Sequence, residues 1–287
     1  MDAQYEDRYW NSADGLSLHY RHYDGPVDKP PLVCLHGLSR NARDFANLCE
    51  RHAGDWRIIV PEMRGRGMSE HAKDPATYAA PTYLADLALL FEQEDVERFV
   101  SVGTSMGGLL TMLMAQLMPG RIAGALLNDI GPVIDPAGIE HIRTYLGHQR
   151  SFPTWVHAAR ALQETQSGSY PDFALEDWLA MAKRSMVLGQ NGRIGFDYDM
   201  DIAEPFNATD ETAVPPDLWP AFEALEGRPL VLVRGALSTL LTTDTISQMQ
   251  QRNPAMEVVT IPRVGHAPTL DEPEAVAALE QLLAKVA

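Results

Sequence analysis

The chain has 287 residues, of which 45% are hydrophobic and 22% are charged, enough for one large domain with a well-buried core. Its 39 acidic and 23 basic residues give a formal net charge of −16, which argues against nucleic acid and anionic membranes as partners. Two cysteines are too few for a disulfide framework, the acidic N-terminus does not resemble a signal peptide, and no apolar run approaches the roughly 20 residues that span a bilayer, so we predict a cytoplasmic protein.

The sequence begins with a predicted hairpin and then alternates strand-like and helix-like segments. Asp14-Gly15 separates two short β runs, as in a tight hairpin. The predicted strands, including these two, are residues 9–12, 16–23, 32–35, 57–60, 99–102, 125–128, 230–233 and 258–261. The predicted core helices are residues 42–52, 82–94, 106–118, 244–251 and 273–286. Continuous Val, Ile and Leu strands that alternate with helices predict an α/β fold, a mostly parallel sheet with helices on both faces.

One interval breaks this alternation. Residues 133–225 contain no convincing strand, but they contain amphipathic stretches at 139–146, 154–163 and 175–188. We therefore predict an all-helical cap at 133–225, inserted between the sixth and seventh strands. Residues 1–132 and 226–287 then form the core.

The sequence Gly103-Thr104-Ser105-Met106-Gly107 stands between a predicted strand and a predicted helix. A serine at such a G-x-S-x-G junction lies on a tight, strained turn, so that its hydroxyl projects from the end of the sheet. The following helix aims its first backbone N–H groups at the same place. Ser105 is therefore the candidate nucleophile.

A serine hydroxyl needs a base to take its proton and N–H donors to stabilise the oxyanion. His266 follows the last predicted strand, so it reaches the same carboxyl edge of the sheet as Ser105 and is the candidate base. The candidate oxyanion donors are the N–H of Met106, directly after the nucleophile, and the N–H of Leu38, in His36-Gly37-Leu38 after the third strand.

Taken together, these motifs resemble the α/β-hydrolase superfamily, in particular its esterase, lactonase and C–C hydrolase branch. The motifs that carry the resemblance are, in chain order, His36-Gly37, Arg64-Gly65-Arg66-Gly67-Met68-Ser69, Gly103-Thr104-Ser105-Met106-Gly107, Asn128-Asp129-Ile130-Gly131-Pro132 and Gly265-His266. The resemblance implies an eight-stranded sheet whose second strand is antiparallel, and a pocket between core and cap.

The acidic member of the triad departs from the family pattern. The family usually carries this acid after the seventh strand, where the present chain has Thr239. Three alternatives follow: Asp129 after the sixth strand supplies the carboxylate, Asp244 reaches in from beyond Thr239, or the site is catalytically weakened. We favour Asp129, because it emerges at the same sheet edge as Ser105.

The sequence thus predicts a serine hydrolase that uses no cofactor and no metal and acts on small carboxylic esters or lactones through an acyl-enzyme. His141 and His148 have helical spacing but no acidic neighbours that would indicate a metal site. The alternatives are a C–C bond hydrolase of diketone-type substrates, with Arg40 as the group that would hold a substrate carboxylate, and a hydrolase-fold binding protein. We expect a monomer or a homodimer.

Overall fold

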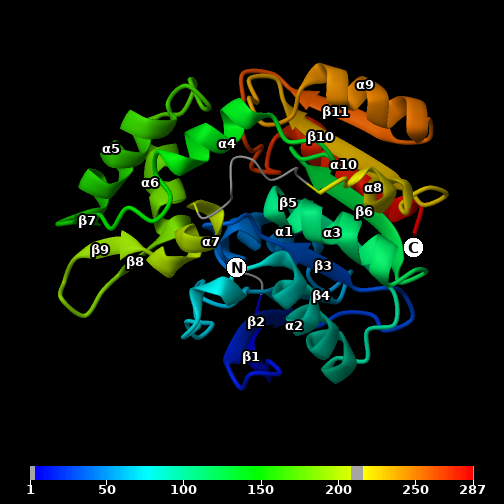
Figure 1. Ribbon diagram of the computed structural model, residues 1–287, viewed down its shortest axis with the longest axis horizontal. Helices are drawn as coiled ribbons and strands as arrows, with labels where there is room; N and C mark the ends of the chain where they lie inside the picture. Colours follow the sequence, from blue (N-terminus) through cyan, green and yellow to red (C-terminus); the bar gives the residue numbers. More distant parts are fainter. Residues whose placement is uncertain (1–3, 208–215, 287) are drawn as a thin grey trace.

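An eight-stranded sheet forms the centre of the computed structural model, which describes residues 4–207 and 216–286 (Figure 1). Its strands are β1 (Glu6–Asn11), β2 (Ser17–Tyr23), β3 (Leu32–Leu35), β4 (Ile58–Pro61), β5 (Phe99–Thr104), β6 (Ile122–Asn128), β10 (Leu230–Gly235) and β11 (Glu257–Ile261). Their order in the sheet is β1-β2-β4-β3-β5-β6-β10-β11. Strand β2 runs antiparallel to both of its neighbours, whereas β4, β3, β5, β6, β10 and β11 are parallel to one another. The predicted mostly parallel sheet is confirmed.

The apolar strands bury both of their faces. In β3, Leu32 and Cys34 belong to one cluster of buried side chains, whereas Val33 and Leu35 belong to another. Successive side chains of a strand point to opposite faces, so a strand covered on both sides needs a continuous apolar run. This requirement explains why these strands show no polar alternation in the sequence.

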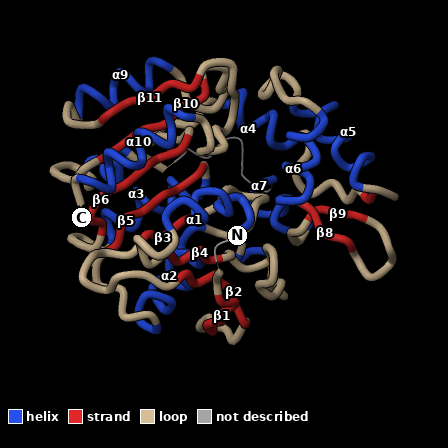
Figure 2. Tube along the Cα trace, turned by 180° about the vertical axis from the view of Figure 1, so that it is seen from behind, coloured by secondary structure: helices blue, strands red, loops and turns tan. Residues whose placement is uncertain are grey.

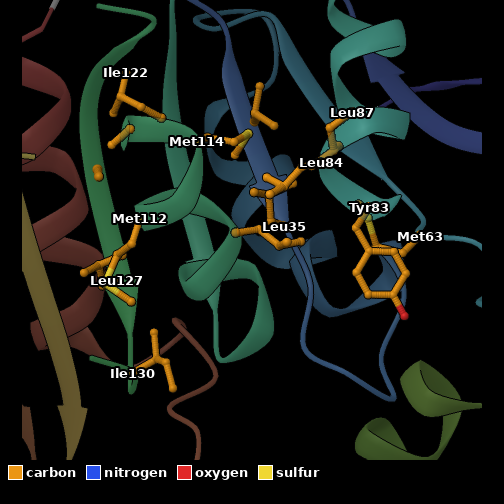
Figure 3. Close-up of a cluster of buried hydrophobic side chains, with 14 of the residues drawn as sticks. Leu35, Met63, Tyr83, Leu84, Leu87, Met112, Met114, Ile122, Leu127 and Ile130 are labelled. Atoms are coloured by element: carbon orange, nitrogen blue, oxygen red, sulfur yellow. The ribbon is translucent and has the colours of Figure 1, made fainter. Parts of the chain in front are cut away.

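Helices cover both faces of the sheet. The core helices are α1 (Ala46–His52), α2 (Ala80–Gln93), α3 (Met106–Leu117), α8 (Trp219–Glu223), α9 (Thr243–Arg252) and α10 (Pro273–Ala284), with the short 3-10 helices η1 (Ala42–Phe45) and η2 (Pro75–Thr77). Helices α2, α3, α8 and α9 contribute to one cluster, which Figure 3 shows in part, and α1 and α10 to the other, seen from behind in Figure 2. Among the described residues, no helix is both long and apolar enough to cross a membrane.

The segment between β6 and β10 lies largely beside the main sheet (Figure 1). Besides α8, its elements are α4 (Pro136–Arg143), β7 (Ser151–Phe152), α5 (Trp155–Gln166), α6 (Leu175–Ser185), β8 (Met186–Leu188), β9 (Ile194–Phe196), η3 (Met200–Ile202) and α7 (Ala203–Asn207). Most of it has its own cluster of buried side chains, built around Trp178 and Leu162. Helix α8 differs, because Phe222 packs in the cluster of the main sheet. Residues 208–215 of the predicted cap lie outside the described residues.

The prediction of an all-helical insertion is wrong. Strands β7, β9 and β8 form a separate three-stranded antiparallel sheet. Helix α6 ends at Ser185, so the stretch predicted as helix at 175–188 finishes as strand β8. These strands have only two or three residues, too few for a recognisable alternation. The signal that would have found them is Asn191-Gly192, a hairpin dipeptide in which Gly192 has φ +72°.

Candidate active site

Ser105 lies at the turn from β5 to α3 with φ +52° and ψ −115°, a conformation that non-glycine residues rarely adopt. The two flanking glycines allow the helix to approach the sheet. A Cβ atom on Gly103 would lie 2.5 Å from the backbone of Gly107, and one on Gly107 would lie 2.0 Å from the carbonyl oxygen of Leu35. No larger side chain fits at either position without moving β3 or α3.

Three side chains from different strand ends meet at this turn. The Nε2 atom of His266 lies 3.0 Å from the Ser105 hydroxyl oxygen. The Nδ1 atom of the same ring lies 2.8 Å from Oδ2 of Asp129. An ionised carboxylate only accepts hydrogen bonds, so Nδ1 carries the proton and Nε2 is free to accept from Ser105. The structure therefore brings together Ser105, His266 and Asp129 in the order that nucleophilic catalysis requires.

Asp129 is completely buried and held at both carboxylate oxygens. It directly follows β6 and has φ +56°. Its Oδ1 accepts a hydrogen bond of 2.9 Å from the N–H of Gly235, and its own N–H donates to the carbonyl of Val233. Since both of those residues belong to β10, the neighbouring strand fixes the carboxylate that faces His266.

The other two positions considered for the acid lie elsewhere. Thr239 is exposed in the loop after β10 and lines the cavity described below. Asp244 is exposed in the first turn of α9, and no hydrogen bond joins it to His266. The side chain that caps α9 is Thr242 rather than Asp244. Of the aspartates weighed from the sequence, the structure places Asp129 against the imidazole.

Residues from both the core and the inserted segment hold the loop that carries His266. The side-chain amide of Asn128 donates to the carbonyl of Pro268, and the hydroxyl of Tyr170 donates to the carbonyl of Ala267, both at 2.8 Å. The N–H of Gly265 donates to the carbonyl of Ser169. Asn128 adjoins the candidate acid, but Tyr170 and Ser169 belong to the insertion, where no sequence motif indicates a role at the site.

The backbone N–H groups of Leu38 and Met106 are the candidate oxyanion donors. Neither N–H donates to an acceptor in the part of the chain that the structure describes. Leu38 follows β3, whereas Met106 is the first residue of α3, where backbone N–H groups have no partner within the helix. Both are therefore available to an oxygen bound near Ser105.

Buried side chains fix the peptide that carries the Leu38 N–H. The ring Nδ1 of His36 lies 2.7 Å from the carbonyl oxygen of Gly37, and Nε2 accepts from the N–H of Met63 at 3.0 Å. Burial lowers the pKa of His36 to about 4, so the ring is neutral and its Nδ1–H donates to Gly37. Arg66 also donates, from Nε, to the carbonyl of Leu38 at 2.9 Å.

Glu62 has a bracing role. It is buried, and its carboxylate accepts from the N–H groups of Met68 and Ala42 and bonds to His19. A Cβ atom on Gly67 would lie 2.1 Å from this carboxylate. Glu62 thus supports the loop that carries Arg66 and does not reach Ser105.

A cavity of about 170 Å³ opens over Ser105 and His266. Its floor comes from the core, including Leu38, and its walls come mainly from the inserted segment. The apolar part of the wall includes Ile142, Leu146, Phe152, Leu162, Met181 and Phe196. Arg40, His141 and His148 also line the cavity. Among the described residues, no group of three or more His, Cys, Asp or Glu side chains is placed to hold a metal ion.

Comparisons with known proteins agree with this architecture. A model of the alpha/beta hydrolase family matches residues 32–279. The chain is 38% identical over 268 residues to a 3-hydroxybutyrate-oligomer hydrolase of Cupriavidus necator, with 91% of each chain covered. It is 26% identical to the mouse sn-1-specific diacylglycerol lipase ABHD11, covering 90% of this chain and 82% of that one. The crystal structure of an alpha/beta hydrolase from Novosphingobium aromaticivorans superposes with a TM-score of 0.95 at 57% identity, covering 99% of both chains.

Proposed function

Because the chain belongs to the alpha/beta hydrolase family, we propose that it is a serine hydrolase that cleaves carboxylic esters or lactones. Ser105 is the nucleophile, His266 the general base and acid, and Asp129 the residue that orients His266. The observation that carries the proposal is the unbroken pair of hydrogen bonds from Ser105 through His266 to Asp129. The N–H groups of Leu38 and Met106 form the oxyanion hole.

The reaction follows from this arrangement. The Ser105 oxygen attacks the carbonyl carbon while Nε2 of His266 takes its proton, and the resulting oxyanion accepts from Leu38 and Met106. Collapse of the intermediate breaks the bond to the alkoxy oxygen, which receives the proton from His266. Water then attacks the acyl-enzyme, gives one proton to His266 and releases the acid, and His266 returns the proton to Ser105. The net reaction consumes one ester and one water and yields an acid and an alcohol.

The buried carboxylate of Asp129 supplies the acid that the chain lacks at Thr239. An aspartate that accepts from Nδ1–H holds the reactive tautomer and stabilises the imidazolium that forms during attack. Asp129 does this from the end of β6, one strand away from the usual position. This placement favours a working hydrolase over a hydrolase-fold binding protein that has lost turnover.

The cavity supports short aliphatic substrates. Its small volume and apolar wall suit a compact acyl or alcohol group. The relative from Cupriavidus necator is named for oligomers of 3-hydroxybutyrate, which are short linear esters. We propose substrates of this class, with the inserted segment acting as a cap over the bound ester.

C–C bond hydrolysis of a diketone is the second candidate, because Arg40 lines the cavity, where it can meet the carboxylate of such a substrate. The two reactions are separated by their products. Ester cleavage releases an alcohol, whereas diketone cleavage releases a ketone and an acid. Turnover of a carboxylate-bearing diketone at least tenfold faster than that of every ester tried would favour the second candidate.

Covalent labelling tests the nucleophile without knowledge of the substrate. A fluorophosphonate should phosphonylate Ser105, with an O–P bond formed and fluoride released, and peptide mass spectrometry should locate the adduct there. Ser105→Ala should remain unlabelled. Labelling of another residue, or no labelling of the folded protein, would contradict the proposal.

A further inference from the structure

Arg40 lies beside the candidate nucleophile. A Cβ atom built on Gly37 would lie 3.6 Å from Cγ of Arg40 and 3.8 Å from Cβ of Ser105, so both side chains border the same small space. Arg40 also lines the cavity over Ser105. Its position follows from the turn after β3, in which the N–H of Arg40 donates to the carbonyl of Gly37.

Within residues 4–207 and 216–286, the guanidinium of Arg40 has no hydrogen-bonded acceptor. Its ion pair joins Nε to Oδ2 of Asp44 at 3.8 Å, which is too long for a hydrogen bond. No side-chain hydrogen bond links Arg40 to any other residue in the described part of the chain. By contrast, Arg43 donates to the carbonyls of Arg184 and Met186 and to the carboxylate of Asp197. The planar N–H donors of Arg40 are thus available to a ligand.

Arg40 is charged in this setting. Burial lowers its pKa, but the carboxylate of Asp44 raises it, and the balance leaves the pKa above its ordinary value. Tyr145 lines the same cavity, and its hydroxyl has no hydrogen-bond partner among the described residues. A cation and a neutral donor therefore border one apolar cavity.

The charge of the cavity opposes that of the whole chain. The sequence carries 39 acidic and 23 basic residues. Of the described residues that line the cavity, Arg40, Arg150 and Arg184 are basic, and Asp44 is the only carboxylate. His141 and His148 add two further groups that are never negative. A basic lining inside an acidic protein attracts an anionic ligand to this opening in particular.

From these observations we infer that Arg40 binds a carboxylate of the substrate, so that the preferred substrates are esters that carry a free carboxylate near the scissile bond. The inference rests on the proposed ester hydrolase and names its substrate class. An arginine fork matches the two oxygens of a carboxylate, and in a partly apolar cavity such a pair is stronger than in water. A linear dimer of 3-hydroxybutyrate has this chemistry, since its ester and its terminal carboxylate belong to one short chain.

The test compares this dimer with its terminal amide, which keeps the ester but lacks the negative charge. Binding is measured by calorimetry in Ser105→Ala, where the ligand is not consumed. The acid dimer should bind about 10- to 100-fold more tightly than the amide, as expected for hydrogen bonds to a charged group. Adding Arg40→Gln should abolish that preference, while Arg160→Gln, the same charge change at an exposed position of α5 outside the cavity lining, should preserve it.

Kinetics of the protein with Ser105 intact supply the second readout. Arg40→Gln should raise KM for the acid dimer about 10- to 100-fold and leave KM for the amide within about twofold. Equal binding of acid and amide to Ser105→Ala would overturn the inference, and so would an equal effect of Arg40→Gln on both. A separate outcome would contradict the proposed function: the protein with Ser105 intact binds the acid dimer but hydrolyses neither ester.

Discussion

Ser105 and Asp129 both occupy the left-handed region of backbone conformation, with φ +52° and +56°. Non-glycine residues rarely adopt such angles, and the surrounding strands must hold them there. Each follows a parallel strand of the same sheet, and each contacts one nitrogen of the His266 ring. The unusual conformations therefore occur at the two residues whose side chains must converge on one imidazole.

The identity of the acid gives a prediction about two neighbouring positions. Asp244→Asn should leave kcat within about twofold, because Asp244 is exposed and does not contact His266. Thr239→Asp should also change kcat by less than about threefold, because Asp129 already holds Nδ1 of His266. The measurement is hydrolysis of p-nitrophenyl butyrate by each variant.

A large rise in kcat for Thr239→Asp would instead show that the site lacks an acid. A loss of more than tenfold in Asp244→Asn would assign the role to Asp244.

Much of the candidate site could be predicted from the sequence at the level of single residues. Ser105 stands at a strand-to-helix turn, and Leu38 and His266 each follow a strand. Such positions lie at the carboxyl edge of a parallel sheet. The free donors of Arg40 could not be predicted, because they depend on where the side chain lies relative to Asp44 and the cavity. The hydrogen bond from Tyr170 to the His266 loop could not be predicted either, since the two segments are far apart in the chain.

The turn between β5 and α3 depends on close contact with β3. Gly107→Ala should destabilise the fold by about 3 kcal/mol or more, because its Cβ would lie 2.0 Å from the backbone oxygen of Leu35. Gly168→Ala is the matched control: a Cβ there meets nothing within 4 Å, so the free energy of unfolding should change by less than about 0.5 kcal/mol. Urea denaturation of both variants measures the difference. Equal stabilities would show that β3 and α3 do not constrain this turn.

Elements were predictable from sequence in proportion to their length and burial. Strand β10 was found because Leu230, Val231, Leu232 and Val233 alternate between two buried clusters and so form an apolar run. Strands β8 and β9 were missed because each has three residues, and Val187 and Leu188 are exposed. Their pairing depends on contacts within the inserted segment, which a local pattern does not show.

The whole molecule should lose stability in mild acid. His22, His36 and His52 are buried, and burial lowers the pKa of each, to about 4 for His36. A histidine that is harder to protonate when folded contributes stability that is complete above its unfolded pKa near 6.5 and is lost as the pH falls through its folded pKa. For His36 the loss should be about 2 kcal/mol between pH 7 and pH 5.

Urea unfolding at pH 7 and pH 5 checks this expectation. His36→Gln carries no titratable group, so its stability should fall by about 2 kcal/mol less than that of the unmodified protein over the same interval. If the stability of His36→Gln showed the same pH dependence as that of the unmodified protein, His36 would not be the source of the loss.

At the scale of the molecule, the layers of the fold could be predicted from the sequence more completely than the cavity. Alternating apolar strands and helices predict a sheet covered on both faces, because few other arrangements bury the apolar side chains of all these elements. The cavity is formed where the inserted segment meets the core, and its walls come from positions as far apart as Arg40, Phe196 and Thr239. Such long-range packing follows from no local pattern.

The central claim is that Ser105, His266 and Asp129 act together in ester hydrolysis. The most direct measurement is kcat for p-nitrophenyl butyrate with the unmodified protein, Ser105→Ala and Asp129→Asn. We expect measurable turnover in the unmodified protein, a loss of at least about 1,000-fold in Ser105→Ala, and a loss of about 1,000- to 10,000-fold in Asp129→Asn. Undiminished turnover in either folded variant, or none in the unmodified protein, would contradict the account.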